Sequence, residues 1–253
     1  MSRKELLSKI GLRQDGRRAE ELRRIRCKLG VFTQPDGSAY LEQGLTKVLA
    51  AVYGPHQVRG GRSKAQHDAA IINCQFSMAV FSTGERKKRP RGDRKSTEIS
   101  IHLHQALLAA VKVELYPWSQ IDVYVEVLHA DGGVFPACVN AATLALIDAG
   151  IPLKEYVCAC TASLANNNVA MVDISNQEET LGGPVLTVVA LPMSAKIVHM
   201  EMSQRFHLDH LPKVLNLALQ GCKDIKAILD DVVRQHVKDI GSSTGWSQTN
   251  RKQ

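Results

Sequence analysis

The order of its periodic segments is the feature that most limits how this chain can fold. Apolar and polar residues alternate from Ala70 to Phe81 and from Ile121 to Val127, and this two-residue period is typical of half-buried strands. Apolar residues at helical spacing predict a helix over 99–111, and an alanine-rich apolar segment predicts another over 137–149. Strands followed by helices in two successive halves indicate an α+β fold with a pseudo-repeat.

The remaining segments complete these two halves. Further strands are expected in the first half over 25–33, 39–43 and 46–53, the last ended by Gly54-Pro55. In the second half they are expected over 156–164, 169–174, 185–191 and 196–202, before one long amphipathic helix over 208–238. Pro136 suits a first helical position and Gly150 a C-terminal cap of the alanine-rich helix.

The same reading divides the chain into four parts. Residues 1–20 are a polar lead-in, 21–152 the first half, 153–240 the second half, and 241–253 a Ser/Thr/Gly/Gln-rich tail expected to be disordered.

Composition narrows the class of protein. With 253 residues, 44% of them hydrophobic and 23% charged, the chain can bury a large core and has an ordinary soluble composition. No apolar run at the N-terminus resembles a signal peptide, and no window approaches a membrane span. The formal charge of +7 favours an acidic partner.

The cysteines and histidines do not form a metal-binding pattern. The six cysteines lie mostly among apolar residues and are expected to be reduced and buried. Cys158-Ala159-Cys160 has the wrong spacing for a zinc motif, and neither the His102/His104 pair nor the His207/His210 pair has further ligands nearby. We therefore expect no metal and no cofactor.

A basic loop over 84–96 separates an expected strand from an expected helix. It contains seven positively charged side chains and two acidic ones. Held by rigid elements, it could bring Arg and Lys to a phosphate backbone. A solvated charged loop and a nuclear-import signal are the alternatives.

Several motifs along the chain resemble those of the RNase PH family. They are Asp15-Gly16-Arg17-Arg18, Gly37 to Val48, Val52-Tyr53-Gly54-Pro55, Arg94 to Ser100, Ala130-Asp131-Gly132-Gly133 and Asn140 to Pro152. The motifs stand in family order over about residues 12–240, with Leu45 replacing the usual Asn. Within the family, the chain looks most like the animal-type ring subunit of the eukaryotic exosome that is related to the archaeal catalytic subunit.

This resemblance implies a ribosomal-protein-S5-domain-2-like fold and a hexameric ring with other RNase PH-like subunits. It also implies S1/KH cap proteins, an associated hydrolytic nuclease, and RNA passing through a central channel. By residue matching, the RNA-binding positions would be Arg62, Ser63, Arg94 and Lys95. The family works in the nucleus, nucleolus and cytoplasm.

The resemblance also tests whether the chain is an enzyme. Family members attack the terminal phosphodiester with inorganic phosphate, which requires a phosphate site, charge stabilisation and a proton donor. Active relatives hold phosphate with a Gly-x-Arg-Ser/Thr stretch at a helix N-terminus. This chain has Gly133-Val134-Phe135-Pro136, so Phe135 replaces the Arg and Pro136 lacks a backbone N–H. Losing the guanidinium costs several kcal/mol of phosphate binding.

An acidic pair is the second test. Active relatives carry Asp-Leu-x-x-x-x-Asp, which Asp173 and Glu179 match here with a longer second side chain. Asp173 could be a remnant of the catalytic pair or a cap on the following turn.

We expect a non-catalytic, RNA-guiding ring subunit. An active phosphate-dependent 3′–5′ exoribonuclease is the alternative, and an interaction module without RNA contact is a third class.

Overall fold

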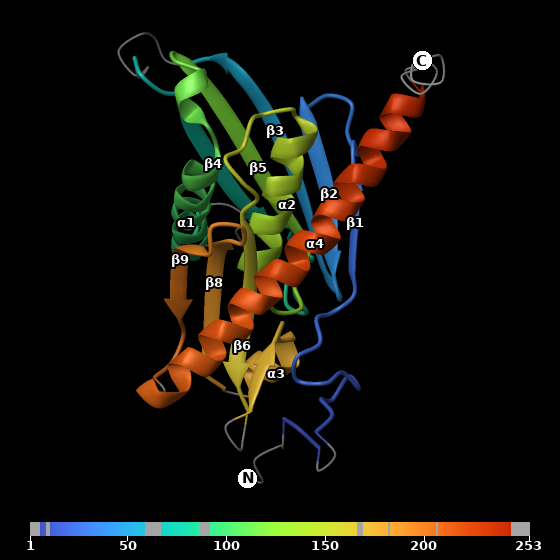
Figure 1. Cartoon of the computed structure of the whole chain (residues 1–253), viewed down its shortest axis with the longest axis vertical. Helices are drawn as coiled ribbons and strands as arrows, with labels where there is room; N and C mark the ends of the chain where they lie inside the picture. The colour runs from blue at the N-terminus through green and yellow to red at the C-terminus, as the bar shows by residue number, and fades with distance from the viewer. Residues whose placement is uncertain are drawn as a thin grey trace.

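The computed structural model describes residues 6–8, 11–58, 67–86, 92–165, 169–181, 183–205 and 207–243. Two β-sheets, one from each half of the chain, are joined through a central helix, α2 (Val134–Asp148) (Figure 1). The expected α+β fold is confirmed.

The first sheet has five strands in the order β1-β2-β3-β5-β4. Their bounds are Ile25–Leu29 (β1), Gly37–Gln43 (β2), Thr46–Gln57 (β3), Ile71–Met78 (β4) and Ser119–His129 (β5). All pairs are antiparallel except β4 and β5, which run parallel with Ile72 opposite Ile121. A parallel pair needs a crossover, which α1 (Arg94–Ala110) and the short 3-10 helix η1 (Val113–Leu115) provide.

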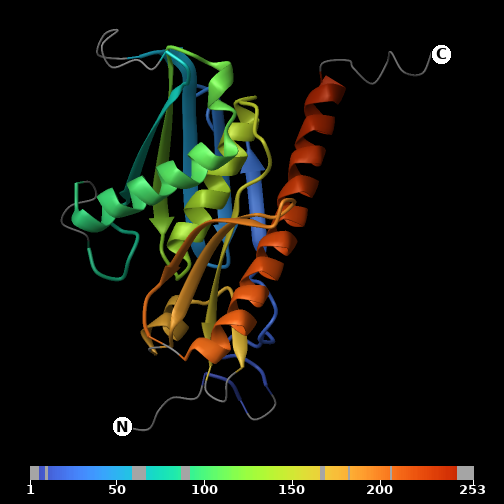
Figure 2. The same ribbon diagram turned by 60° about the vertical axis from the view of Figure 1, so that its left-hand side comes forward.

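The second sheet is antiparallel, in the order β7-β6-β8-β9. Its strands are Cys158–Leu164 (β6), Ala170–Val172 (β7), Val185–Leu191 (β8) and Lys196–Met202 (β9). A short helix, α3 (Asn176–Thr180), follows β7, and a 3-10 turn, η2 (Leu208–His210), leads into α4 (Leu211–Ser243). The apolar stripe of α4 packs on this sheet through buried residues such as Ala218, Cys222 and Ile225. Figure 2 shows α4 running past both halves of the molecule.

Small residues let α2 approach both sheets closely. Eleven of its fifteen residues, from Pro136 to Leu146, are buried. At Gly37 in β2, a Cβ atom would lie 2.3 Å from the carbonyl oxygen of Ala145, so only glycine fits there. This contact joins the first sheet to the central helix.

Several expected boundaries were wrong. β1 ends at Leu29 rather than Thr33. β3 does not end at Gly54-Pro55, because a shift in register after Tyr53 lets pairing with β5 resume at His56. Helix α2 begins at Val134, so Pro136 is its third residue, where a missing N–H costs no intrahelical bond.

The terminal parts also differ from expectation. Helix α4 continues through Ser243, three residues into the expected disordered tail, and residues 244–253 lie outside the described residues. The expected lead-in is not separate from the fold, because Arg13 is buried against the second half.

The cysteines form no disulfide among the described residues. All six thiols are free, and four are buried: Cys138, Cys158, Cys160 and Cys222. Burial raises the pKa of Cys222 to about 12, which keeps that thiol protonated. Among the described helices, none is both long and apolar enough to cross a bilayer.

Candidate functional site

A cavity of about 340 Å³ opens where α1, the start of α2 and the second sheet meet. Its lining brings together three residues that the sequence singled out: Lys95 from α1, Phe135 from α2 and Glu179 from α3. The other polar and charged residues of the wall are Glu98, His102, Thr161, Thr187, Glu201 and Ser203. Segments more than 100 residues apart therefore form one site.

The glycine pair before α2 shapes one side of this cavity. Gly132 and Gly133 have φ angles of 77° and 58°, in the left-handed region that favours glycine. A Cβ at Gly133 would also lie 2.9 Å from a guanidinium nitrogen of Arg23. The turn thus presents the N-terminus of α2 to the cavity, and Phe135 lies in the first turn of this helix.

Three aromatic rings occupy the region around Phe135. Its ring lies edge-on to His102 and to His199, with centroid distances of 6.2 and 5.8 Å. The two imidazoles are 4.3 Å apart. Burial lowers the pKa of His199, and His102 lowers it further against the opposing effect of Glu201. The ring of His199 is therefore neutral at pH 7 and adds no positive charge to the cavity.

The charged residues of the lining are mostly acidic. Glu98, Glu179 and Glu201 line the cavity, and Lys95 is the only Lys or Arg among its described lining residues. Carboxylates repel a bound phosphate at short range. Among the described lining residues, acidic side chains therefore outnumber basic ones by three to one.

Asp173, the first residue of the acidic motif, does not line the cavity. Its carboxylate is fully buried and accepts hydrogen bonds from the backbone N–H and Nη2 of Arg23 and from Nε2 of Gln43, each at 2.8 Å. Its φ of 52° is unusual for a residue other than glycine. Of the two alternatives for Asp173, a cap on the following turn is not what the structure shows, because the partners of this carboxylate come from the first half of the chain.

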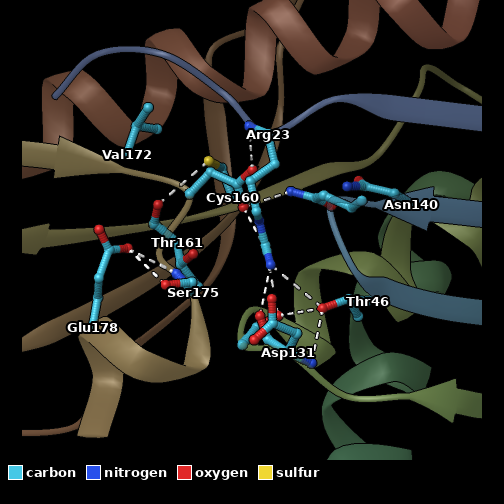
Figure 3. Close-up of polar contacts among 12 residues, drawn as sticks. Arg23, Thr46, Asp131, Asn140, Cys160, Thr161, Val172, Ser175 and Glu178 are labelled. Carbon is cyan, nitrogen blue, oxygen red and sulfur yellow. Dashed lines mark hydrogen bonds and ion pairs between the residues drawn. The ribbon is translucent and has the colours of Figure 1, made fainter. Parts of the chain in front are cut away.

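Arg23 connects this carboxylate to the glycine turn. Figure 3 shows its guanidinium reaching Asp131 and Thr46. The Nη1 group donates to the carbonyl of Asp131 at 2.7 Å, and Nη2 donates to that of Gly132 at 3.3 Å. The Arg23–Asp173 pair therefore positions the wall of the cavity instead of entering it.

A second buried ion pair holds α3. Arg13 donates to Glu178 and also to the carbonyl oxygens of Val172 and Asp173. Glu178 additionally completes a capping box with Ser175 at the start of α3. Sequence reasoning missed Arg13, Arg23 and Glu178. The sequence showed only that the N-terminal segment is polar, and no pattern in it indicated which charged side chains are buried.

The expected RNA-binding residues are partly described. Arg94 and Lys95 are exposed in the first turn of α1, after the N-cap Asp93, which accepts from the backbone N–H of Arg94 at 2.8 Å. Arg62, Ser63 and the segment 87–91 of the basic loop lie outside the described residues.

Solved structures define the class of fold. The crystal structure of rice (Oryza sativa) Rrp46 matches with a TM-score of 0.78 at 24% identity, covering 88% of this chain and 100% of that one. A chain of the Archaeoglobus fulgidus exosome, solved with RNA bound to the active site, matches with a TM-score of 0.73 at 21% identity. The match covers 86% of this chain and 92% of that one. At these identities the likeness establishes the fold alone, an RNase PH-like α+β architecture.

Sequence comparisons then give the family. Residues 21–152 match the model described as "3' exoribonuclease family, domain 1", and residues 155–221 match domain 2. The human protein named "Exosome complex component RRP41" is 56% identical over 241 residues, covering 95% of this chain and 98% of its own. The Thermoplasma acidophilum protein named "Exosome complex component Rrp41" is 36% identical over 239 residues, which cover 94% of this chain and 95% of its own. The chain belongs to the RNase PH family of 3′ exoribonucleases.

Proposed function

We propose that this chain is a non-catalytic ring subunit of an exosome that guides RNA through the central channel for 3′–5′ processing and degradation. The names of its relatives support the exosome part of this proposal, because the human, Arabidopsis thaliana and Thermoplasma acidophilum relatives are all named exosome complex components.

Phe135 is the main reason to propose that the subunit has no phosphorolytic activity. Phosphorolysis needs a bound phosphate and donors directed at the transferring phosphoryl group. The cavity offers an aromatic ring at the position where active relatives have Arg, and three glutamates around it. Backbone N–H groups at the start of α2 remain, but they act without a guanidinium and against nearby carboxylates.

Arg94 and Lys95 support the proposal that the subunit binds RNA. The N-terminus of α1 is already electropositive through the helix dipole, and no acidic residue occupies its first turn. Two cations there are unfavourable for the isolated helix but raise the positive potential that a phosphate backbone meets. Exposure leaves both side chains free to reach RNA.

The partners follow from the same proposal. We expect RNase PH-like neighbours in a hexamer, S1/KH cap proteins above it and a separate hydrolytic nuclease that receives the RNA. We also propose that this subunit acts in the nucleus, the nucleolus and the cytoplasm. Native mass of the purified complex tests it: a large hetero-oligomer is expected, whereas a homohexamer would point to a free RNase PH enzyme.

An active phosphorolytic exoribonuclease is the second candidate. Glu179 favours it, because this residue lines the cavity at the position where active relatives carry the second aspartate. Its partner Asp173 argues against it, because that carboxylate is committed to Arg23.

A further inference from the structure

We propose that the cavity beside Phe135 binds a cation, the guanidinium of an arginine side chain presented by a protein partner. The proposal concerns the same cavity as the proposed function but does not depend on RNA contact. Active relatives bind phosphate, an anion, at this position, whereas the cavity of this chain would bind a cation.

Unpaired carboxylates give the first argument. Glu98 and Glu179 line the cavity, and neither side chain makes a hydrogen bond or ion pair within the part of the chain that the structure describes. Glu201 has only a 4.0 Å approach to His199. Arg is the side chain best suited to carboxylates, because its planar fork can donate two parallel hydrogen bonds to one carboxylate.

Thr161 gives a second, independent argument. Its side chain lines the cavity, the residue is only 4% exposed, and its hydroxyl oxygen has no hydrogen-bond partner among the described residues. A buried hydroxyl without a partner is costly, so a ligand that supplies one gains free energy. A guanidinium carries five N–H donors and no acceptor, which matches an oxygen-rich lining of carboxylates and a hydroxyl.

The aromatic wall is the third argument. Phe135 and the imidazole of His102 both line the cavity, and His199 lies against both rings. A flat cation stacks on aromatic faces and is attracted by their electrons. Because its pKa is lowered, His199 stays neutral at pH 7 and does not repel such a ligand.

Lys95 is the one basic side chain among the described lining residues and opposes the binding of a cation. It is exposed in the first turn of α1, where its strongly hydrated ammonium is screened by solvent. Three carboxylates outnumber it in the lining. A phosphate or a nucleotide would meet these same carboxylates, so the charge balance favours a cationic protein group over RNA.

The test is a titration of the purified full-length chain with N-acetyl-arginine amide, followed by NMR or calorimetry. The citrulline analogue is the matched ligand control, because it keeps the shape but has no charge. We expect saturable binding of the arginine analogue and binding at least about tenfold weaker for citrulline. The E179Q/E201Q variant should weaken arginine binding about five- to tenfold, since exposed pairs contribute modestly each.

Further variants locate the site. Thr161→Val should weaken binding severalfold by removing the hydroxyl acceptor. Glu114→Gln, an exposed glutamate on η1 away from the cavity, should have no effect. Thermal unfolding of each variant confirms that it is folded.

Three results would overturn the proposal: no saturable binding of the arginine analogue, equal binding of citrulline, or unchanged binding by E179Q/E201Q. Displacement of the analogue by inorganic phosphate or by a nucleoside monophosphate would also count against it. Failure of arginine binding alone would leave the RNA-guiding function untouched, whereas phosphate binding in this cavity would contradict both.

Discussion

The guanidinium of Arg23 lies 2.8 Å from the carboxylate of Asp173, and both side chains are buried. The pair joins the segment before β1 to the segment after β7, so it links the two halves of the chain. Asp173 therefore occupies the first position of the family's acidic motif but serves as a structural anchor in this chain.

Removing this carboxylate should destabilise the protein strongly. Asp173→Ala leaves Arg23 as an unpaired buried charge, so the free energy of unfolding should fall by about 3–5 kcal/mol. Glu179→Ala, the other acidic position, removes an exposed carboxylate and should change it by less than about 0.5 kcal/mol. Urea denaturation measures both, and similar values for the two variants would contradict the structural assignment of Asp173.

Glu178 should make stability depend on acid pH. Burial raises the pKa of this carboxyl, but hydrogen bonds from Arg13 and from the backbone of Ser175 outweigh it and hold the pKa below 4.5. The unfolded chain then binds the proton at higher pH than the folded chain, so stability is lost as pH falls below about 4.5.

The control for this effect is Glu178→Gln, which cannot titrate. Its free energy of unfolding should be lower than that of the wild type at pH 7, and the difference should shrink as pH is lowered towards 3. Parallel pH profiles for the two proteins would show that the Arg13–Glu178 pair does not hold this carboxyl ionised.

Charge reversal at the start of α1 should weaken RNA binding. In the assembled ring, Arg94→Glu with Lys95→Glu should lower RNA crosslinking severalfold, and the slope of log K against log salt should fall by about 0.7 per lost phosphate contact. Lys213→Glu with Lys223→Glu, two exposed lysines on α4, is the control matched for net charge. Equal crosslinking by the Arg94/Lys95 variant and the control would leave Arg94 and Lys95 without a role in RNA contact.

Restoring the guanidinium should recover part of the phosphate site. Phe135→Arg should raise the affinity of the chain for inorganic phosphate at least about tenfold, because a charge-assisted donor then faces the N-terminus of α2. Phe135→Leu is the control, since it removes the ring without adding charge. Wild-type phosphate affinity equal to that of Phe135→Arg would mean that Phe135 does not disable the site.

Local patterns predicted much of this fold. β8 and β9 were predicted at both ends, because each is a short run rich in apolar residues and the turn over 192–195 separates them. The prediction for α1 began five residues late, since its polar first turn has no apolar period. β3 was cut short because its continuation depends on pairing with β5 across a bulge.

Only some residues of the candidate site could be predicted from the sequence. Motif matching placed Phe135 and Glu179, and the structure brings both to one cavity with Lys95. The anchoring role of Asp173 could not be predicted, because its partners Arg23 and Gln43 lie 130 or more residues away in the sequence. Contacts at such separations are fixed by tertiary packing, and no local pattern encodes them.

The most direct test of the central claim is a phosphorolysis assay. Purified chain, alone and within its ring, is incubated with labelled RNA, Mg²⁺ and inorganic phosphate, and nucleoside diphosphates are measured. We predict no phosphate-dependent release above background in either form, because the cavity has Phe135 and three glutamates where a phosphate would bind. Release of nucleoside diphosphates that requires phosphate and is lost in Glu179→Ala would contradict the non-catalytic account.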